Sequence, residues 1–474
     1  MQAVAVMSGE RDPAPLADAV ARHVALTAST AVPPEAAHAA RRSLLDAIGV
    51  MLAATGLSAA AASYRQHAMG PDGGPCTVLG AIGGAEPQAA AFANGALAHA
   101  LDFGDTFDPG PAHPHAALVP ALMALIEFGC EASYGDLLAA LAIGGDLACR
   151  LSLAPAHAYE DAGWYPPPLV NLIASAAACA RLLHLPPGRI VAAMSFALLS
   201  GSFPAALKLD RASPLRGTRE AFAAGGAVQA ALLAQSGASG FDDPLGGPGG
   251  FFEVYAGGCR HEILMDGLGQ RYLGAEVSFK PWPACRGTHA YIEAALDLRR
   301  QTDPADIVSL TAGVGPIQQM LVSALPPPGE PLSATQAKFS IPFTLALAFL
   351  DGEVGLPSFD QRHLADSRYR AFAARVAAAP VPQWGREHAA SGKLSVRLSD
   401  GSERHHDVDH ALGSPRRPMS DTALVAKFAD CARYALPACT LVDAVVAAET
   451  ILCAPLDAPA INCIRFLQRG KSVR

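Results

Sequence analysis

PLVNLIASAAACARLL, residues 168–183, is apolar on nearly every side when wound as an α-helix, and similar segments precede and follow it. A helix without a broad polar face is buried on most sides. Five further segments before residue 240 show helical periodicity between glycine and proline breaks. They are Ala36–Leu52, Pro87–Asp102, Ala116–Phe128, Tyr134–Leu151 and Glu220–Gln235. Together these segments predict a large helical domain.

The composition agrees with closely packed helices. Hydrophobic residues make up 51% of the chain but aromatic residues only 6%, so alanine supplies much of the apolar surface and lets helix backbones approach one another. A chain of 474 residues is too long for one compact core. Two domains are therefore expected.

The pattern changes near residue 274. Ala275–Phe279 has strand character, Ile307–Val314 alternates in part, and residues 394–398 alternate cleanly into an Asp400-Gly401 turn, which is typical of a hairpin. Helical patterns persist at Thr288–Arg299 and Phe343–Leu350. We expect a smaller α+β domain over residues 274–411.

After Pro418 the helical pattern returns. Ser420 is a suitable N-cap for a helix over Asp421–Tyr434, and a last apolar helix covers Leu441–Leu452. The C-terminal helices are predicted to rejoin the first domain. The expected fold is mainly α, with a helical domain formed by residues 1–273 and 412–474 and the α+β domain inserted at 274–411.

Charge, cysteine content and hydropathy argue against several classes of protein. The net charge of −8, with no basic tail, argues against nucleic-acid binding. Ten scattered cysteines without a C-x-x-C pair suit a reducing cytoplasm, and the first 15 residues lack an export signal. The run Ile190–Leu207 barely reaches membrane-spanning length and contains Ser195 and Pro204, so we interpret it as a buried central helix and expect no membrane span.

The stretch from Asn94 to His115, NGALAHALDFGDTFDPGPAHPH, concentrates histidines and aspartates in a chain otherwise poor in charge. At about 100° per residue, His99, Asp102 and Thr106 fall within roughly 60° on one helix face. The Pro-Gly-Pro break at 109–111 then turns the chain just before His113. One helix and one loop are expected to direct a carboxylate, a hydroxyl and an imidazole to one point.

These residue types suit proton transfer beside a carboxylate. His113 is the candidate general acid or base, and Asp102 would orient it or stabilise its charge. Thr106 would donate a hydrogen bond to a substrate carboxylate, and Lys280 would supply positive charge for a developing carbanion or enediolate. As an alternative, a histidine before a proline at a helix start is only a capping or turn residue. His99 is expected to pack and hydrogen-bond in the core.

An ordered set of motifs resembles the MmgE/PrpD family, which includes 2-methylcitrate dehydratase, cis-aconitate decarboxylase and iminodisuccinate epimerase. The motifs are Asp46-Ala-Ile-Gly49, Asn94-Gly95, His99-Ala-Leu-Asp102 with Asp105-Thr106, His113-Pro114, Lys280 through Pro283 with Cys285, Ala337-Lys-Phe-Ser340 and Lys427-Phe428. The resemblance implies a large helical domain, a smaller inserted lid domain, a homodimer, and chemistry without a metal or organic cofactor. It places Asp102, Thr106, His113 and Lys280 at active-site positions.

The chain departs from the family pattern at several of these positions. Tyr165 stands near a position where decarboxylases and dehydratases of the family generally have histidine, so it is a candidate replacement acid or base. Arg216 replaces a lysine, which keeps the charge but changes its geometry. Cys285 replaces a histidine, Phe343 a tyrosine and Gly104 an aspartate. These changes make cis-aconitate itself a doubtful substrate.

Further basic residues point to an anionic ligand. Lys208, Arg211, Arg216 and Arg219 cluster within twelve positions, and Arg286 follows Lys280 by six. The alternative is a solvated loop with ordinary surface charges. His115 is either a substrate contact or a surface residue. We therefore expect substrate contacts from Thr106, Arg216, Lys208, Cys285, Arg286 and His115, and catalysis by His113, Asp102, Lys280 and Tyr165.

The predicted function is a metal-independent lyase, either a dehydratase or a decarboxylase, acting on a small di- or tricarboxylic acid. An epimerase or isomerase of a related acid is the near alternative, because Tyr165 or Cys285 could serve the opposite face of the substrate. A metal hydrolase built from His113, His115, Asp102 and Asp105 is a second class. A non-catalytic binding protein on the same scaffold is a third.

Overall fold

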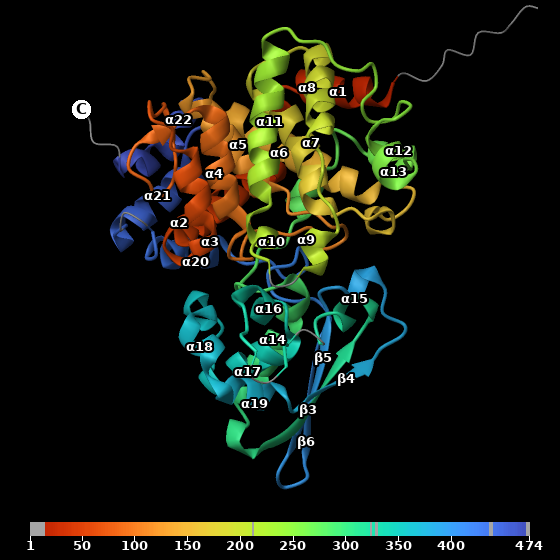
Figure 1. The fold of residues 1–474 in the computed structure, drawn as a ribbon, viewed down its shortest axis with the longest axis vertical. Helices are drawn as coiled ribbons and strands as arrows, with labels where there is room; N and C mark the ends of the chain where they lie inside the picture. The colour runs from red at the N-terminus through yellow and green to blue at the C-terminus, as the bar shows by residue number, and fades with distance from the viewer. Residues whose placement is uncertain (1–14, 211–212, 323–324, 328–329, 436–438, 471–474) are drawn as a thin grey trace, which may run out of the picture.

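The computed structural model describes residues 15–210, 213–322, 325–327, 330–435 and 439–470. Two predictions fall on residues outside these ranges. They concern residues 1–14, in which no export signal is predicted, and Arg211 of the basic cluster. The chain forms a larger helical body and a smaller body that holds the main sheet (Figure 1). The predicted mainly α fold is confirmed.

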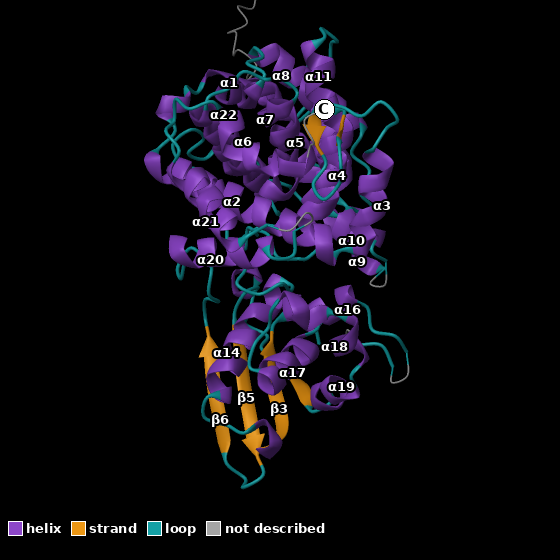
Figure 2. Cartoon of the chain, turned by 90° about the vertical axis from the view of Figure 1, so that its left-hand side faces the viewer, coloured by secondary structure: helices purple, strands orange, loops and turns teal. Residues whose placement is uncertain are grey.

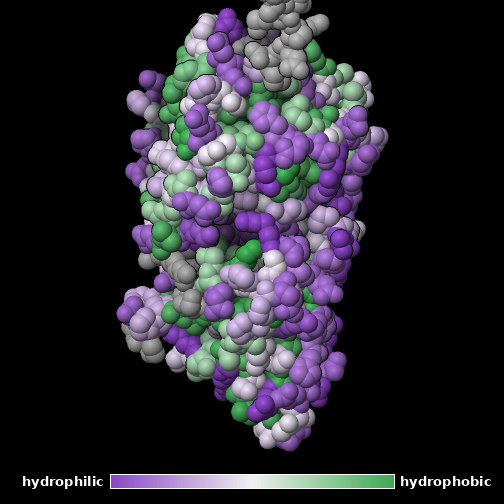
Figure 3. Space-filling model, turned by 90° about the vertical axis from the view of Figure 1, so that its right-hand side faces the viewer, coloured by the Kyte–Doolittle hydropathy of each residue, from purple (hydrophilic) through white to green (hydrophobic). Residues whose placement is uncertain are grey.

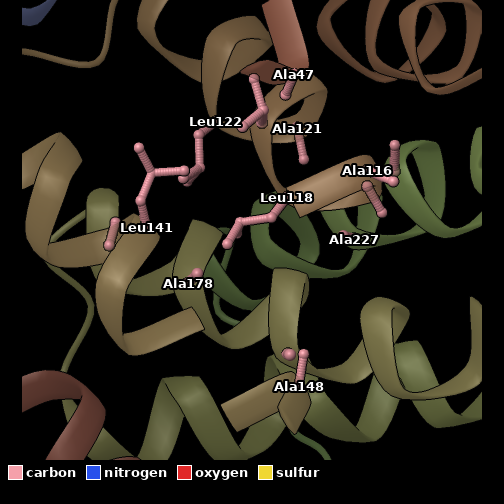
Figure 4. Packing of buried hydrophobic residues seen from close by; sticks show 14 of the residues in the cluster. Ala47, Ala116, Leu118, Ala121, Leu122, Leu141, Ala148, Ala178 and Ala227 are labelled. Carbon is pink, nitrogen blue, oxygen red and sulfur yellow. The ribbon is translucent and has the colours of Figure 1, made fainter. Parts of the chain in front are cut away.

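The helical domain is built on six long, largely buried helices. They are α2 (Pro34–Leu57), α4 (Pro87–His99), α5 (His115–Glu127), α6 (Tyr134–Leu153), α7 (Pro166–Leu182) and α11 (Glu220–Gln235). Small side chains permit their close approach. A Cβ at Gly95 of α4 would lie 2.7 Å from the carbonyl oxygen of Glu220 and 2.9 Å from Cβ of Ala224 on α11. Alanines such as Ala47, Ala116 and Ala227 fill the same core between leucines (Figure 4).

Shorter elements complete this domain. They are α1 (Leu16–Leu26), α3 (Ala59–Ala68), β1 (Cys76–Thr77), β2 (Gly84–Ala85), α8 (Pro187–Leu199), α9 (Ala206–Leu209), α10 (Leu215–Thr218), α12 (Phe251–Ala256) and α13 (His261–Met265). The predicted central helix at 190–207 is wrong in its extent, because α8 ends at Leu199 just before Gly201.

The C-terminal helices return to the helical domain. These are α20 (Asp421–Ala432), α21 (Leu441–Cys453) and α22 (Ala460–Ile464). Helices α20 and α21 pack on α2, and α22 packs on α6. Ser420 caps α20 by accepting a hydrogen bond from the backbone N–H of Ala423, which confirms the predicted N-cap.

The inserted domain is a four-stranded sheet covered by helices. Its strands are β3 (Ile307–Val314), β4 (Val376–Pro380), β5 (Gly392–Leu398) and β6 (Glu403–Val408), in the order β4-β3-β5-β6. Only β3 and β4 run parallel. The predicted hairpin joins β5 to β6, and Gly401 in its turn has φ +85°.

Helices pack beside the sheet of the inserted domain. They are α14 (His289–Arg299), α15 (Pro316–Gln319), α16 (Ala334–Lys338), α17 (Ile341–Asp351), α18 (Gln361–Ala365) and α19 (Ser367–Ala373). Helix α14 packs on β5 and β6, and α17 packs on α14 (Figure 2). The hydrophobic core of this domain draws its buried residues from Ala284 to Ala411.

The predicted strand at 275–279 is wrong. Residues Leu273–Glu276 form a 3₁₀ turn, and only Ser278 makes a β-bridge, with Thr106. The strand character of these residues therefore marks a segment that crosses from one domain to the other and pairs with the Asn94–His115 stretch.

Among the residues that the structure describes, no single helix is long and apolar enough to cross a membrane. Helices α2 and α3 pass the same test only as a pair, and they bend by 99° where they meet.

Candidate active site

A cavity of about 200 Å³ lies between the two domains. The helical domain lines it with His99, Asp102, Thr106, Phe107, Asp108, His113, Tyr165 and Arg216, and the inserted domain with Lys280, Cys285, Arg286, Gly287, Ile317, Met320, Leu321, Phe339 and Ala389. Seen from one side, the molecular surface is hollowed where the domains meet (Figure 3). Eight of the ten predicted site residues line this cavity.

His113 is held in one tautomer by the backbone. Its Nδ1 lies 2.9 Å from the carbonyl oxygen of Asp105 and 2.8 Å from Oγ1 of Thr106. A carbonyl oxygen only accepts hydrogen bonds, so Nδ1 carries the proton and Nε2 has a free lone pair. The hydroxyl proton of Thr106 then remains available to a ligand. His113 is therefore arranged as a general base.

Two imidazoles in the cavity are uncharged at neutral pH. Burial, together with His99, Lys280 and Arg219, holds the pKa of His113 well below its usual value. Burial and Arg219 lower the pKa of His99 to about 3, although Asp102 opposes this shift. The two rings lie 4.4 Å apart between centroids. Since a base works in its unprotonated form, His113 stays competent as the pH falls below 6.5.

We expect NMR to detect this protonation state directly. Long-range ¹H–¹⁵N spectra of protein labelled at histidine should show His113 as the neutral Nδ1–H tautomer from pH 8 down to pH 5, because its pKa is lowered by burial and by neighbouring positive charge. The resonance is assigned by its loss in His113→Asn. A titration midpoint near 6.5, or an Nε2–H tautomer, would contradict the assignment of the base.

Asp102 does not contact His113 in the way that the sequence suggested. Its Oδ1 lies 3.2 Å from Nε2 of His99, and both side chains are buried. Burial alone would raise the pKa of Asp102, but the hydrogen bond from His99 and the charges of Lys280 and Lys338 hold it well below its usual value. Asp102 is thus a carboxylate that orients His99, while the Asp105 carbonyl orients His113.

The predicted helix face is also wrong. Helix α4 ends at His99, and Asp102 has φ +51°, a left-handed conformation that ends helices. Asp102 and Thr106 reach the cavity from the following turn. Their approach to His99 results from this turn and not from helical periodicity.

Three lysines distant in sequence hold this turn. Nζ of Lys338 donates to the carbonyl of Leu101 at 2.8 Å, Nζ of Lys280 to that of Asp102 at 3.0 Å, and Nζ of Lys427 to that of Phe103 at 2.6 Å. Lys427 also pairs with the buried Asp46, at 2.6 Å. Carbonyls beyond a helix C-terminus attract cations.

Lys338, in the Ala337–Ser340 motif, has an unusually low pKa for a lysine. Burial lowers the pKa of Lys338 to about 8. Its ammonium group nevertheless carries most of its charge at pH 7, directly behind the turn that holds Asp102. It does not line the cavity, and sequence reasoning assigned it no role.

Tyr165 and Arg216 line the cavity next to each other. Arg216 is buried, and its guanidinium carbon lies 3.9 Å from the ring centre of Phe339 and 5.9 Å from that of Tyr165. One of its terminal nitrogens donates to the carbonyl of Lys208, but its buried Nε has no partner among the described residues. The side chain lines the cavity and carries a permanent positive charge, so Arg216 can bind an anionic ligand.

Arg286 lines the cavity but is already engaged. Its Nε lies 3.2 Å from both carboxylate oxygens of Asp108, and its terminal nitrogens donate to the carbonyls of Ala411 and Leu412. Ser278 donates to the same carboxylate at 2.6 Å. Arg286 thus joins the two domains through Asp108, a residue that sequence reasoning overlooked.

Cys285 lies beside Lys280 on the inserted-domain side. Burial raises the pKa of its thiol, although Lys280 opposes this shift. Its backbone N–H donates to the carbonyl of Lys338 at 3.0 Å. At neutral pH the group is a protonated thiol and can act as a weak proton donor.

Two predicted contacts do not line the cavity. His115 is buried, and its Nδ1 lies 2.7 Å from Oδ2 of Asp105, so it is neither a substrate contact nor a surface residue. Lys208 lies outside the cavity, with Nζ 3.9 Å from a carboxylate oxygen of Glu160. The four residues proposed for a metal hydrolase do not share one site, because His113 and Asp102 line the cavity whereas His115 and Asp105 do not. In the part of the chain that the structure describes, no group of three His, Cys, Asp or Glu residues is placed to hold a metal ion.

Comparisons with known proteins identify the family of the chain. The family model described as the MmgE/PrpD N-terminal domain matches residues 18–264, and the MmgE/PrpD C-terminal domain matches residues 282–448. The cis-aconitate decarboxylase of Homo sapiens is 28% identical over 72% of each chain. The 2-methylcitrate dehydratase of Cupriavidus necator is 25% identical over 70% of this chain and 72% of its own.

Proposed function

The chain belongs to the MmgE/PrpD family, as its ordered motifs predicted, and we propose that it is a lyase that acts on a small carboxylic acid by moving a proton at the carbon next to a carboxylate. Relatives named as a decarboxylase and a dehydratase support the lyase class. The observation that carries the proposal is the His113 tautomer, because the Asp105 carbonyl leaves Nε2 unprotonated beside the cavity.

In the proposed elimination, Nε2 of His113 removes the proton from the carbon next to the carboxylate. The electron pair delocalises into the carboxylate, where Lys280 and Arg216 offset the added negative charge. The bond to the neighbouring hydroxyl then breaks, and the hydroxide leaves as water with a proton from Tyr165 or Cys285. Every role belongs to a residue that lines the cavity.

The protonation state of His113 suits elimination, in which it removes a proton, whereas decarboxylation would have to draw its proton from Tyr165 or Cys285. Loss of CO2 leaves an electron pair on carbon that must receive a proton, so a decarboxylase needs a protonated group in that place. His113 is neutral, and its proton lies on Nδ1, which faces the backbone. It is therefore better suited to removing a proton than to supplying one.

Incubation with di- and tricarboxylic hydroxy acids in D2O, followed by mass spectrometry, tests the proposal. We expect an unsaturated acid lighter by one water, and its formation should require His113. Loss of CO2 instead would assign the decarboxylase reaction. Stabilisation by acids without any turnover across the panel would contradict the lyase and favour a binding protein.

The same experiment separates the isomerase alternative. Tyr165 and Cys285 line the cavity and could return a proton to the opposite face of the substrate. An epimerase would incorporate one deuterium into recovered substrate without loss of mass as water or CO2. A homodimer and a cytoplasmic location stay predictions, which sedimentation and cell fractionation can test.

A further inference from the structure

The inserted domain presents an apolar wall to the cavity. This wall consists of Ile317, Met320, Leu321, Phe339 and Ala389. Ile317 lies on α15, and Met320 and Leu321 directly follow that helix. None of these side chains offers a hydrogen bond or a charge to a carboxylate, so the end of a ligand that lies here is apolar.

The charges lining the cavity nearly cancel. Three cations, Lys280, Arg216 and Arg286, face two carboxylates, Asp102 and Asp108, and so one positive charge is left. The two histidines are neutral, as shown above. Outside the lining, Lys338 adds a further positive charge behind Asp102, whereas Arg219, beside Tyr165, is paired with Glu220 at 3.2 Å. The cavity thus compensates one or two negative charges of a ligand but not three.

The guanidinium of Arg216 lies next to the apolar wall. It is stacked on Phe339, which belongs to that wall, and its Nε lacks a partner among the described side chains. Arg286 cannot serve a second carboxylate without giving up Asp108 and the contact between domains. If Arg216 and Lys280 hold a carboxylate of the substrate, the substituent next to that carboxylate therefore lies against the apolar side chains of this wall.

We propose that the substrate is an acid with one or two carboxylates and an alkyl or aryl substituent that packs against Ile317, Met320 and Leu321, and that a third carboxylate is rejected. This inference rests on the proposed function, since it names the substrate class for the same site. The physical reason is desolvation: a third carboxylate would lose its hydration in the cavity without gaining a cation.

Titration calorimetry at pH 7 with matched acids tests the inference. The probes are citrate and the 2-methyl, 2-ethyl and 2-isopropyl malates, in which an alkyl group replaces one carboxymethyl arm of citrate. We expect the best alkyl malate to bind at least about tenfold more tightly than citrate to the wild-type protein. Ile317→Lys should lower the ratio of the affinity for the best alkyl malate to the affinity for citrate about tenfold or more, because it adds a cation to the wall. Val308→Lys, at an exposed position of the same domain outside the cavity, should leave the ratio unchanged.

The outcomes separate this inference from the lyase itself. Citrate binding as tightly as every alkyl malate, binding of none of the probes, or an unchanged ratio in folded Ile317→Lys would each overturn the substrate class. Selective binding of alkyl malates without water loss or deuterium uptake would support the substrate class and count against the lyase. Turnover of citrate in preference to the alkyl malates would do the reverse.

Discussion

His113→Asn should lower the rate of water loss by about 10²–10⁴-fold, the usual contribution of a general base. The asparagine amide can still donate to the Asp105 carbonyl, as Nδ1 does, but it has no nitrogen in the place of Nε2. The loss should appear in kcat, with little change in the affinity for a carboxylic acid. Initial rates at saturating substrate and binding measured by calorimetry separate the two effects.

His157→Asn is the matched control for this variant. His157 is exposed and does not line the cavity, so its replacement should leave the rate within about twofold. Both variants should melt at the wild-type temperature. If His113→Asn kept more than a tenth of the wild-type rate while remaining folded, another group would have to be the base.

Lys280→Met should reduce kcat/KM by about 10²–10³-fold, as for other groups that stabilise charge in a transition state. Nζ of Lys280 is buried, and it faces the cavity while holding the carbonyl of Asp102. Methionine fills a similar volume without a charge or a donor. The variant therefore loses charge stabilisation and loosens the turn that carries Asp102.

Lys208→Met provides the control for loss of a lysine. Lys208 was predicted to bind substrate, but it lies outside the cavity and near Glu160. We expect its kcat/KM to stay within about twofold of wild type. Equal losses in the two variants would show that the net charge of the region matters and that the position of Lys280 does not.

Much of the fold could be predicted because its signals are local. Helix α11 spans Glu220–Gln235 and β3 spans Ile307–Val314, both as predicted, and the turn at Gly401 joins the expected strands. Periodicity and turn residues encode such elements within a few positions. The strand predicted at 275–279 was wrong because an extended pattern does not reveal whether a partner strand exists.

The candidate site was harder to predict because its contacts are remote. Helix α4 ends at His99, and three carbonyls of the turn that follows accept hydrogen bonds from lysines. These lysines are separated from the carbonyls by 178, 237 and 324 positions in the sequence. No local pattern encodes the position of those lysines. For the same reason, sequence spacing could not separate His113, which lines the cavity, from His115, which is paired with Asp105.

The sequence by itself determined the helical domain, the inserted α+β domain, the family and the candidates His113, Thr106 and Lys280. These features depend on residue type and on spacing over a few turns. Only the tertiary structure decided the tautomer of His113, the pairing of Asp102 with His99 and the charge balance of the cavity. Each of these depends on which groups from distant parts of the chain meet away from water, where hydrogen bonding and burial set protonation.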